Sequence, residues 1–352
     1  MFFECSIIQF SLLSCSMSVH IPLIDVRSPG EFKQGHIPNA INLPLFTDAE
    51  RAVIGTLYKQ NGHDAAVLEG LRIVGPKMAP LVEEATRIAP DKKLRVHCWR
   101  GGMRSNSVAW LFRQAGFKVE VLAGGYKNYR QQVLSSLAKP LPLVVLSGST
   151  GSGKTYILHE LKILGEQVID LEGLAHHKGS AFGALGQGQQ PSIEQFENNL
   201  CVEIGQFDLN KPIWIEDEAR KIGSVFIQDH LWNQMKQAPL FNLDIPISER
   251  LDFLVKEYGH FEKEALGASI LKIQKRLGGQ HVKACFEALE LGNLHFVAEV
   301  TLRYYDQTYA FGQSKRDPQK SIHFPCEKLD IIEIARSLKN YLQTHTLPIY
   351  HD

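Results

Sequence analysis

A single cysteine stands in a loop that could hold an anion. Cys98 follows the apolar segment Leu94–His97, which we expect to be a strand, and precedes a helix predicted from about Ser105. The loop contains two glycines and the guanidinium groups of Arg100 and Arg104. Freed backbone N–H groups, a helix N-terminus and positive side chains all favour a thiolate and an anionic adduct on it. We therefore predict that Cys98 is a catalytic nucleophile with Arg100 and Arg104 beside it, rather than a structural core cysteine.

A phosphate-binding loop lies farther along the chain. The sequence GSTGSGKT matches G-x-x-x-x-G-K-[ST] and follows an apolar strand predicted at 143–147, which is the context that this motif requires. Its glycines turn backbone N–H groups toward phosphate oxygens, Lys154 adds positive charge, and the Thr155 hydroxyl is a candidate magnesium ligand. The predicted phosphate-binding residues are Gly148, Gly151, Ser152, Gly153, Lys154 and Thr155. The motif does not distinguish ATP or GTP from another phosphate ester.

Acidic residues follow two further predicted strands, at 166–170 and 212–216. Asp170 and Glu172 follow the first strand, and Glu216 and Glu218 follow the second. The carboxyl ends of parallel strands share one edge of a sheet, where carboxylates can control a metal ion or a substrate. We interpret these four acids as metal or substrate ligands of the phosphate site. Solvated loops are the alternative.

Repeated strand–loop–helix units must position these residues. Ser28 and Pro29 are a predicted N-cap and first helical residue, and Gly116 ends the helix that follows the cysteine loop. Such units predict α/β domains with parallel sheets. Two prolines in the segment 138–143 separate two domains. We expect an N-terminal extension at 1–19, one domain at 20–138, and a second domain at 139–352 that turns helical beyond residue 245.

The charges of the chain balance, so it has no global field that attracts a polyanion. Lys+Arg and Asp+Glu number 38 each in 352 residues, and contact with RNA therefore needs a local basic surface. The candidate RNA contacts are Arg220, Lys221, Lys275 and Arg276, with Lys272 and Lys283 on the same predicted helical stretch from Ala265. A solvated charged face is the alternative.

Cysteine spacing and hydropathy favour a reducing compartment. The six cysteines are scattered, without C-x-x-C or zinc-type spacing, so we expect neither a disulfide framework nor structural zinc. The apolar first twenty residues lack the basic region of an export signal, and we interpret them as an extension or as sequence upstream of a start at Met17. No later apolar run reaches the roughly 18 residues that span a bilayer. We expect a cytoplasmic protein without a membrane segment.

Signatures in the first half of the chain resemble those of a rhodanese domain: DVRSPGEF and GHIPNAINLP, then CWRGGMRS, then LAGGY. In such domains a loop cysteine carries sulfur or selenium, and the resemblance implies this role for Cys98. His97, Cys98 and Arg104 also match the H-C-x5-R pattern of cysteine phosphatases, whose longer loop cradles a tetrahedral oxyanion. Selenophosphate fits such a loop better than thiosulfate. A cysteine phosphatase or sulfurtransferase domain fused to a nucleotide-binding, kinase-like domain is the alternative function.

Five strings spread along the chain are TDAERAVIGTLYKQNGHDAAVLEGL, CWRGGMRS, LSGSTGSGKT, DLEGLAHHKGSAFG and IEDEARKIG. Together they resemble the tRNA 2-selenouridine synthase family. The resemblance implies an N-terminal rhodanese-like parallel-sheet domain and a C-terminal P-loop α/β domain with a helical C-terminal part. It implies an enzyme that converts wobble 2-thiouridine of tRNA to 2-selenouridine, by geranylation of sulfur with geranyl diphosphate and then replacement using selenophosphate. The implied partners are tRNA carrying 2-thiouridine and an enzyme that supplies selenophosphate.

Overall fold

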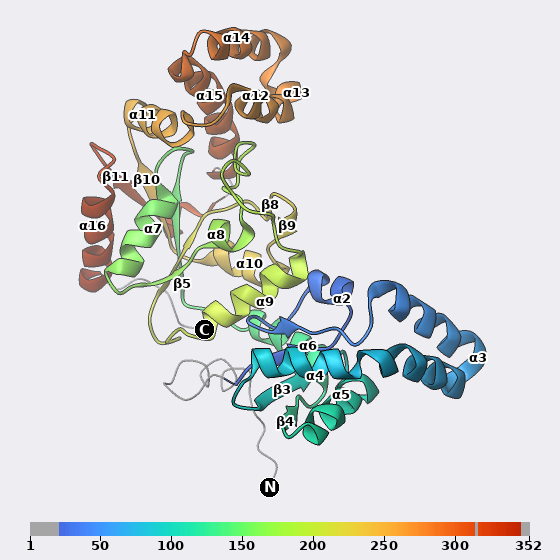
Figure 1. The fold of residues 1–352 in the computed structure, drawn as a ribbon. Coiled ribbons are helices and arrows are strands. Elements are labelled where there is room, and N and C mark those ends of the chain that lie inside the picture. The colour runs from blue at the N-terminus through green and yellow to red at the C-terminus, as the bar shows by residue number, and fades with distance from the viewer. Residues whose placement is uncertain (1–20, 314–315, 346–352) are drawn as a thin grey trace. The chain divides into compact units, whose positions relative to one another are not determined.

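The computed structural model describes residues 21–313 and 316–345, which divide into two compact units (Figure 1). The first unit contains the described residues up to Leu137 and also residues 194–206. The second contains residues 138–193 and the described residues from Phe207 onward. The chain thus enters the second unit, returns to the first for one helix, and leaves it again. The extension expected at 1–19 and the alternative start at Met17 lie outside the described residues.

The first unit is built on a four-stranded parallel sheet with the strand order β2-β1-β3-β4. Its strands are β1 (Leu23–Asp25), β2 (Ile41–Asn42), β3 (Lys93–His97) and β4 (Lys118–Val121). Its helices include α2 (Pro29–Gln34), α3 (Asp48–Val74), α4 (Met78–Ile88), α5 (Met103–Gln114) and α6 (Gly125–Leu137), with a 3-10 turn at Gly75–Lys77. Ile24 and Val96 of the central strands are fully buried in one apolar core with Phe112 of α5.

Local sequence signals begin and end these elements as expected. Ser28 caps α2, because its Oγ accepts from Glu31 N while Glu31 Oε2 accepts from Ser28 N, and Pro29 is the first helical residue. Gly116 follows α5 with a φ of 85°, a left-handed conformation that glycine adopts without strain. The strand expected at 94–97 is present as β3, and α5 begins at Met103 rather than at about Ser105. The cysteine loop is thereby held between β3 and α5.

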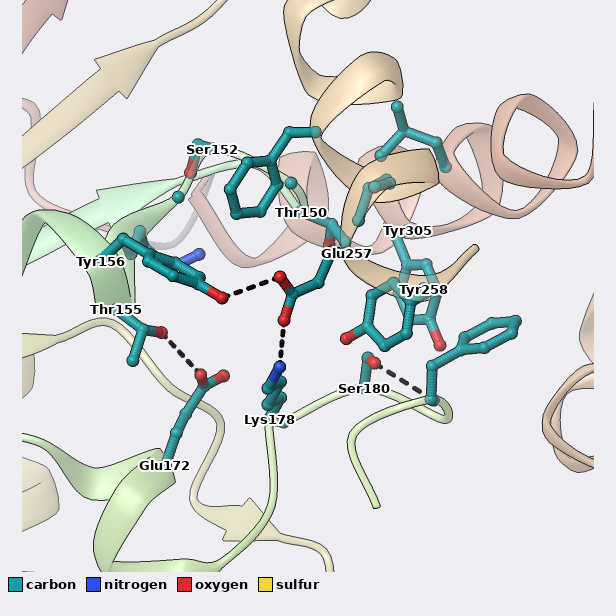
Figure 2. A pocket seen from close by; sticks show the side chains of 18 of the residues that line it. Thr150, Ser152, Thr155, Tyr156, Glu172, Lys178, Ser180, Glu257, Tyr258 and Tyr305 are labelled. Carbon is teal, nitrogen blue, oxygen red and sulfur yellow. Dashed lines mark hydrogen bonds and ion pairs between the residues drawn. The ribbon is translucent and has the colours of Figure 1, made fainter. Parts of the chain in front are cut away.

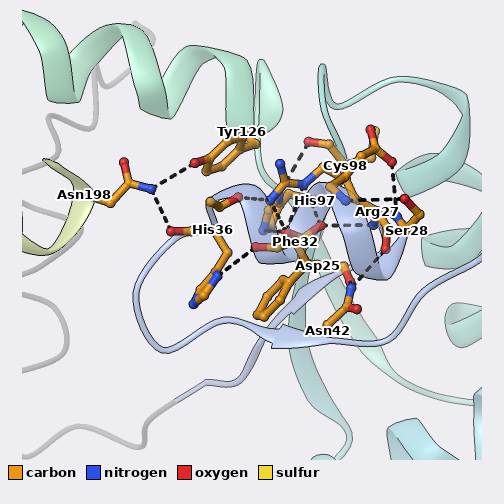
Figure 3. Close-up of polar contacts among 12 residues, drawn as sticks. Asp25, Arg27, Ser28, Phe32, His36, Asn42, His97, Cys98, Tyr126 and Asn198 are labelled. Atoms are coloured by element: carbon orange, nitrogen blue, oxygen red, sulfur yellow. Dashed lines mark hydrogen bonds and ion pairs between the residues drawn. The ribbon is translucent and has the colours of Figure 1, made fainter. Parts of the chain in front are cut away.

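Helix α9 (Ile193–Ile204) packs in the first unit, although the chain on either side of it belongs to the second. Asn198 on this helix is fully buried, and its Nδ2 donates to His36 O and to Tyr126 Oη, each at 2.9 Å (Figure 3). Its Oδ1 accepts from Arg130 at 2.6 Å. Fully satisfied buried polar groups of this kind fix a helix in one position. No local pattern predicted this excursion, because it depends on contacts between residues far apart in the chain.

The second unit is built on a five-stranded parallel sheet with the order β11-β10-β5-β7-β6. Its strands are β5 (Leu143–Gly148), β6 (Gln167–Ile169), β7 (Ile213–Glu216), β10 (Leu240–Asp244) and β11 (Ser321–Pro325), with a separate antiparallel pair, β8 (Lys221–Ile222) and β9 (Val225–Phe226). Its helices are α7 (Lys154–Ile163), α8 (Leu171–Ala175), α10 (Asp229–Gln237), α11 (Ile247–Tyr258), α12 (Lys263–Lys272), α13 (Gln274–Leu277), α14 (Gly279–Glu290), α15 (Leu294–Gln313) and α16 (Ile331–Thr344). Both main sheets are wholly parallel, which confirms the expected α/β class. No helix among the described residues has the length and apolar content needed to cross a membrane.

Two strands of the second sheet were not predicted. The strands expected at 143–147, 166–170 and 212–216 are present as β5, β6 and β7, and beyond residue 245 the chain turns helical as expected, apart from strand β11. Strand β11 lies at the edge of the sheet, none of its residues is fully buried, and it ends at Pro325. Its partner β10 is distant in sequence. Neither an apolar run nor a hairpin turn therefore marks it.

Replacing Asn198 with alanine should destabilise the first unit. The change removes one hydrogen bond each from His36 O, Tyr126 Oη and Arg130, and at about 1 kcal/mol for each such bond the free energy of unfolding should fall by roughly 3 kcal/mol. Hydrogen exchange of the α6 and α9 amides measures this unit separately from the second. The matched control is Asn199→Ala, which removes a hydrogen bond from Gln195 of the same helix and should cost less than about 0.5 kcal/mol. Equal losses in both variants would contradict the role given to Asn198.

Candidate functional site

Cys98 lies at the carboxyl end of β3 with its side chain 3% exposed. Its Sγ lies 3.2 Å from Ser105 Oγ, whose single hydrogen can be donated either to Gly102 O at 3.0 Å or, when Cys98 is ionised, to the thiolate. The carbonyl oxygen of Cys98 accepts from Tyr126 N at 2.9 Å, and any side chain at Gly125 would clash with that oxygen. The beginnings of α5 and of α6 therefore both fix the loop around the thiol.

Hydrogen bonds favour the thiolate of Cys98 against the effect of burial. Burial raises the pKa of this thiol, whereas the Ser105 hydroxyl, the backbone N–H groups of Ser105 and Arg100, and the charge of Arg104 lower it; the pKa of Cys98 ends below its ordinary value. Arg104 thus contributes charge, while Arg100 contributes a backbone N–H rather than its guanidinium. Ser105 was not predicted as a site residue. A serine directly after Arg104 in the first turn of the helix could have indicated it.

The position of Arg104 is set by an ion pair. Both of its terminal nitrogens donate to Glu31, at 2.7 and 3.3 Å. Burial raises the pKa of Glu31, but the hydrogen bond and the charge of Arg104 lower it overall, so that Glu31 is held as a carboxylate. Because Glu31 also caps α2, the guanidinium beside the cysteine loop is tied to the beginning of a helix.

A buried network of polar residues lies behind the loop (Figure 3). Arg27, which is 1% exposed, donates to both oxygens of the fully buried Asp25, at 2.6 Å for the shortest bond. Its guanidinium carbon lies 3.8 Å from the centre of the Tyr126 ring. His97 Nε2 lies 3.6 Å from Asp25 Oδ2, but burial lowers the pKa of His97 more than Asp25 raises it. Burial therefore favours the neutral form of His97, and its ring nitrogens face Asp25 and the backbone oxygen of Cys98.

The phosphate-binding loop joins β5 to α7, and β5 lies between β7 and β10 in the sheet. Ligands of parallel α/β sheets bind at such a point, where the chain connections diverge. Lys154 Nζ donates to Gly148 O at 2.9 Å. Thr155 Oγ1 donates to Glu172 Oε2 at 2.7 Å. The buried Oγ of Ser152 has no hydrogen-bond partner among the described residues, so the loop keeps a donor for a ligand.

All four predicted acids gather beside this loop. Glu216 is 1% exposed, and its Oε1 accepts from Glu172 N at 2.7 Å. Burial, together with Asp170 and Glu172, raises the pKa of Glu216 well above its ordinary value, and burial with Glu172 does the same for Glu218. Asp170 caps α8 and lies 2.7 Å from His159 Nε2. Within the residues that the structure describes, no three histidine, cysteine or acidic side chains are arranged as a metal site.

One cavity of about 450 Å³ connects the phosphate-binding loop to an apolar chamber (Figure 2). Its polar end contains all six residues predicted for phosphate, Gly148, Gly151, Ser152, Gly153, Lys154 and Thr155. Its apolar end is lined by side chains of α11, α12 and α15, among them Phe253, Leu254, Leu266, Leu294, Val297 and Leu302. Glu257 joins two sides of the cavity, because it accepts from Tyr156 Oη at 2.8 Å and pairs with Lys178. Sequence reasoning missed this chamber, since separate helices supply its lining.

The predicted RNA contacts Arg220 and Lys221 lie next to the β8–β9 pair of the second unit. Arg220 forms an ion pair with Asp229. Lys221 Nζ lies 5.4 Å from the centre of the Phe226 ring. Both side chains are exposed, as a contact with RNA phosphates requires, although each already has a partner within the chain.

The helical stretch predicted from Ala265 is interrupted, so the prediction that its cations share one helix face is wrong. The chain turns at Ile273 and at Gly278, where φ is 88°, and divides the stretch into α12, α13 and α14. Lys275 and Arg276 are exposed on the short helix α13. The cations of the predicted basic face, Lys272, Lys275, Arg276 and Lys283, therefore come from three helices, and helical spacing does not bring them together.

Comparisons with known proteins cover almost the whole chain. Residues 141–341 match a family model described as the tRNA 2-selenouridine synthase AAA domain, and residues 12–132 match the rhodanese-like domain. A tRNA 2-selenouridine synthase of Bdellovibrio bacteriovorus is 36% identical over 88% of this chain and 94% of its own length. Those of Shewanella sediminis and Aeromonas salmonicida are 35% and 34% identical over 84% and 83% of this chain, and 88% and 87% of their own lengths. The chain therefore belongs to the tRNA 2-selenouridine synthase family.

Proposed function

We propose that this enzyme converts 2-thiouridine at the wobble position of tRNA to 2-selenouridine in two steps. The sulfur is first alkylated by the geranyl group of geranyl diphosphate. The alkylated sulfur is then replaced by selenium from selenophosphate. The second unit carries out the first step, and the Cys98 loop of the first unit carries out the second. Because tRNA is the substrate, the reaction takes place in the cytoplasm.

The observation that carries this proposal is the continuity of the second unit's cavity. Its polar end suits a diphosphate, and its other end presents aliphatic and aromatic side chains in place of groups that would recognise a purine base. A volume of about 450 Å³ suits a molecule of this size. At about 0.8 kcal/mol per buried CH₂, burying most of a ten-carbon chain contributes on the order of 5 kcal/mol. A phosphate ester with a hydrocarbon tail therefore fits better than ATP or GTP.

The first step needs a site that stabilises a leaving diphosphate. The sulfur attacks the first carbon of the geranyl group, the carbon–oxygen bond breaks, diphosphate leaves with the electron pair, and N3 of the base loses its proton. Lys154 and the N–H groups of its loop neutralise the charge that develops on the diphosphate. The oxygens of Thr155 and Glu172, 2.7 Å apart, are hard donors that suit Mg²⁺. That ion, when bound, would neutralise further charge on the diphosphate.

The second step needs a site for a tetrahedral oxyanion. The Cys98 loop offers backbone N–H groups, the charge of Arg104 and a thiol whose pKa is lowered. Selenium in selenophosphate is already at the selenide level. It therefore needs no oxidant or reductant: selenium attacks C2, the C2–S bond breaks and geranylthiol leaves, and water cleaves the phosphorus–selenium bond to release phosphate, while selenophosphate and water supply the protons of the thiol and of N3. A partner enzyme would supply the selenophosphate.

Contact with the tRNA backbone is assigned to exposed cations of the second unit. These are Arg220 and Lys221 beside the β8–β9 pair, and Lys275 and Arg276 on α13. A chain of zero formal net charge binds a polyanion through local groups of this kind, and its affinity falls as salt rises.

Mass analysis of nucleosides tests the proposal directly. Thiolated tRNA is incubated with the enzyme, geranyl diphosphate and selenophosphate, and each co-substrate is omitted in turn. Geranylthiouridine should form without selenophosphate, and selenouridine should form only with both. Release of phosphate from an aryl phosphate, with no change in the thiolated tRNA, would support the alternative of a cysteine phosphatase instead.

Replacing Cys98 with serine should abolish selenouridine formation, because the hydroxyl of serine does not ionise at neutral pH. Geranylation should continue. Matched controls are Cys201→Ser, Cys285→Ser and Cys326→Ser, since burial raises the pKa of both Cys285 and Cys326 and neither lies in an anion-holding loop. A Cys98→Ser enzyme with a near-normal selenouridine yield would refute the role given to this thiol.

Replacing Ser105 with alanine should raise the pKa of Cys98, because the hydroxyl at 3.2 Å favours the thiolate. The rate of Cys98 alkylation by iodoacetamide follows the thiolate fraction. Its pH midpoint should therefore move upward, and the rate at neutral pH should fall. Ser107→Ala, at an exposed position of the same helix, should leave the profile unchanged. An unshifted midpoint in Ser105→Ala would show that the hydroxyl does not act on the thiol.

Replacing Lys154 with alanine should slow geranylation by about 100-fold, as removal of one preorganised positive group or donor from a transition state typically does. Selenation of tRNA that already carries the geranyl group should be affected much less. Rates of the two half-reactions are measured separately by nucleoside mass analysis. Equal losses in both would instead indicate a role of Lys154 in tRNA binding or folding.

A further inference from the structure

A second cavity lies in the first unit beside the cysteine loop and has a volume of about 270 Å³. Trp99, which directly follows Cys98, lines it together with Arg104 of α5 and Glu194 of α9. Its other lining residues are polar or charged: Arg27, Glu31, Gln34 and Arg51. Among the residues that line this cavity, Trp99 is thus the single aromatic one.

Neighbouring groups fix the indole of Trp99, but part of it remains exposed to solvent. Its ring centre lies 5.8 Å from that of Tyr126, with an angle of 49° between the two ring planes. The backbone oxygen of Trp99 accepts from Lys127 N at 2.8 Å. Tyr126 is itself fully buried and bonded to Glu194 and Asn198. Nevertheless 38% of Trp99 is exposed. A positioned aromatic face beside a nucleophile suits a ligand with a flat face.

The charges around this cavity nearly cancel, which argues against a small free anion as its ligand. Each arginine has an acidic neighbour: Arg27 pairs with Asp25, and Arg104 and Arg51 both face Glu31. Glu194 adds a further carboxylate. The cavity instead offers hydrogen-bond donors and acceptors around one aromatic face, with Gln34 able to supply both. A neutral heterocycle with donor and acceptor edges matches this set.

We infer that this cavity binds the target pyrimidine ring of the RNA, turned out of its stack; the inference rests on the proposed function. The ring stacks on Trp99, and both its O4 and its N3, which carries no proton once the sulfur is alkylated, accept from Gln34 or an arginine of the cavity. An enzyme that modifies a base must take it out of the stack, and it recognises the exposed base by stacking and by its polar edges. Arg104, whose charge lowers the pKa of the Cys98 thiol, lines the same cavity as Trp99, so a ring on this indole lies next to the cysteine loop.

Binding of two anticodon stem-loop RNAs tests this inference without requiring catalysis. One fluorescein-labelled RNA carries 2-thiouridine at the wobble position, and the other has an abasic site there. Trp99→Ala should weaken binding of the first RNA by about 5- to 100-fold, because stacking on an aromatic side chain contributes that much to single-strand binding. Binding of the abasic RNA should change little. Trp99→Phe keeps a ring and should retain most of the affinity.

The matched control is Trp110→Ala, because Trp110 is 56% exposed on α5 and does not line the cavity. It should bind both RNAs like the parent. Thermal unfolding of each variant checks that the fold is kept, and Trp99→Phe provides the test if Trp99→Ala does not fold. In that case phenylalanine should lose affinity only for the RNA with a base, and by a smaller factor. An equal loss for both RNAs, or no loss for either, would overturn the inference.

The outcome separates this inference from the proposed function. An enzyme that forms selenouridine normally but whose Trp99 variants bind both RNAs like the parent would refute the base-binding cavity and leave the function standing. Absence of geranylated and selenated products with the parent enzyme would refute the function, whatever the Trp99 variants bind.

Discussion

The buried guanidinium of Arg27 is the point on which the first unit depends. It bonds Asp25 on β1 and the carbonyl of Gly35 after α2, and it lies against the Tyr126 ring on α6. Two buried charges of opposite sign are costly to separate, since removing one partner typically costs about 3–5 kcal/mol. The order that Arg27 imposes on Tyr126 extends through that tyrosine to Asn198 of α9 and to the indole of Trp99. The geometry of the thiol loop therefore depends on a buried ion pair behind the loop.

The second unit depends on a different balance, between cations and acids at the end of β5. Burial and the neighbouring acids raise the pKa of Glu216 and that of Glu218 well above the ordinary value, which favours the protonated form of each carboxyl. The apolar chamber on α11, α12 and α15 lowers the local polarity, and in the proposed function it would strengthen the field of Lys154 at the leaving diphosphate.

Sequence reasoning succeeded where the chemistry is local. The Cys98 loop and the loop from Gly148 to Thr155 are continuous motifs between a strand and a helix, and both occur where they were predicted. Reasoning failed where distant segments meet. The apolar chamber, the cavity at Trp99 and the packing of α9 all combine residues far apart in the chain. No regular spacing of residues in the sequence predicts them. The prediction of a helical stretch from Ala265 failed for a local reason. Gly278 has a left-handed conformation that breaks the helix, and helical periodicity alone does not show such a break.

The return of α9 to the first unit has a consequence for how the chain is made. Ribosomal synthesis delivers residues in order, and domains generally fold as they emerge. The first unit, however, cannot satisfy the hydrogen bonds around Asn198 until α9 has left the ribosome, by which time the phosphate-binding loop and β6 have already been translated. The two units must therefore complete their folding in overlapping intervals. Genes that encode the two halves separately, divided at the proline segment, would leave the first product without α9, which the second product would carry instead.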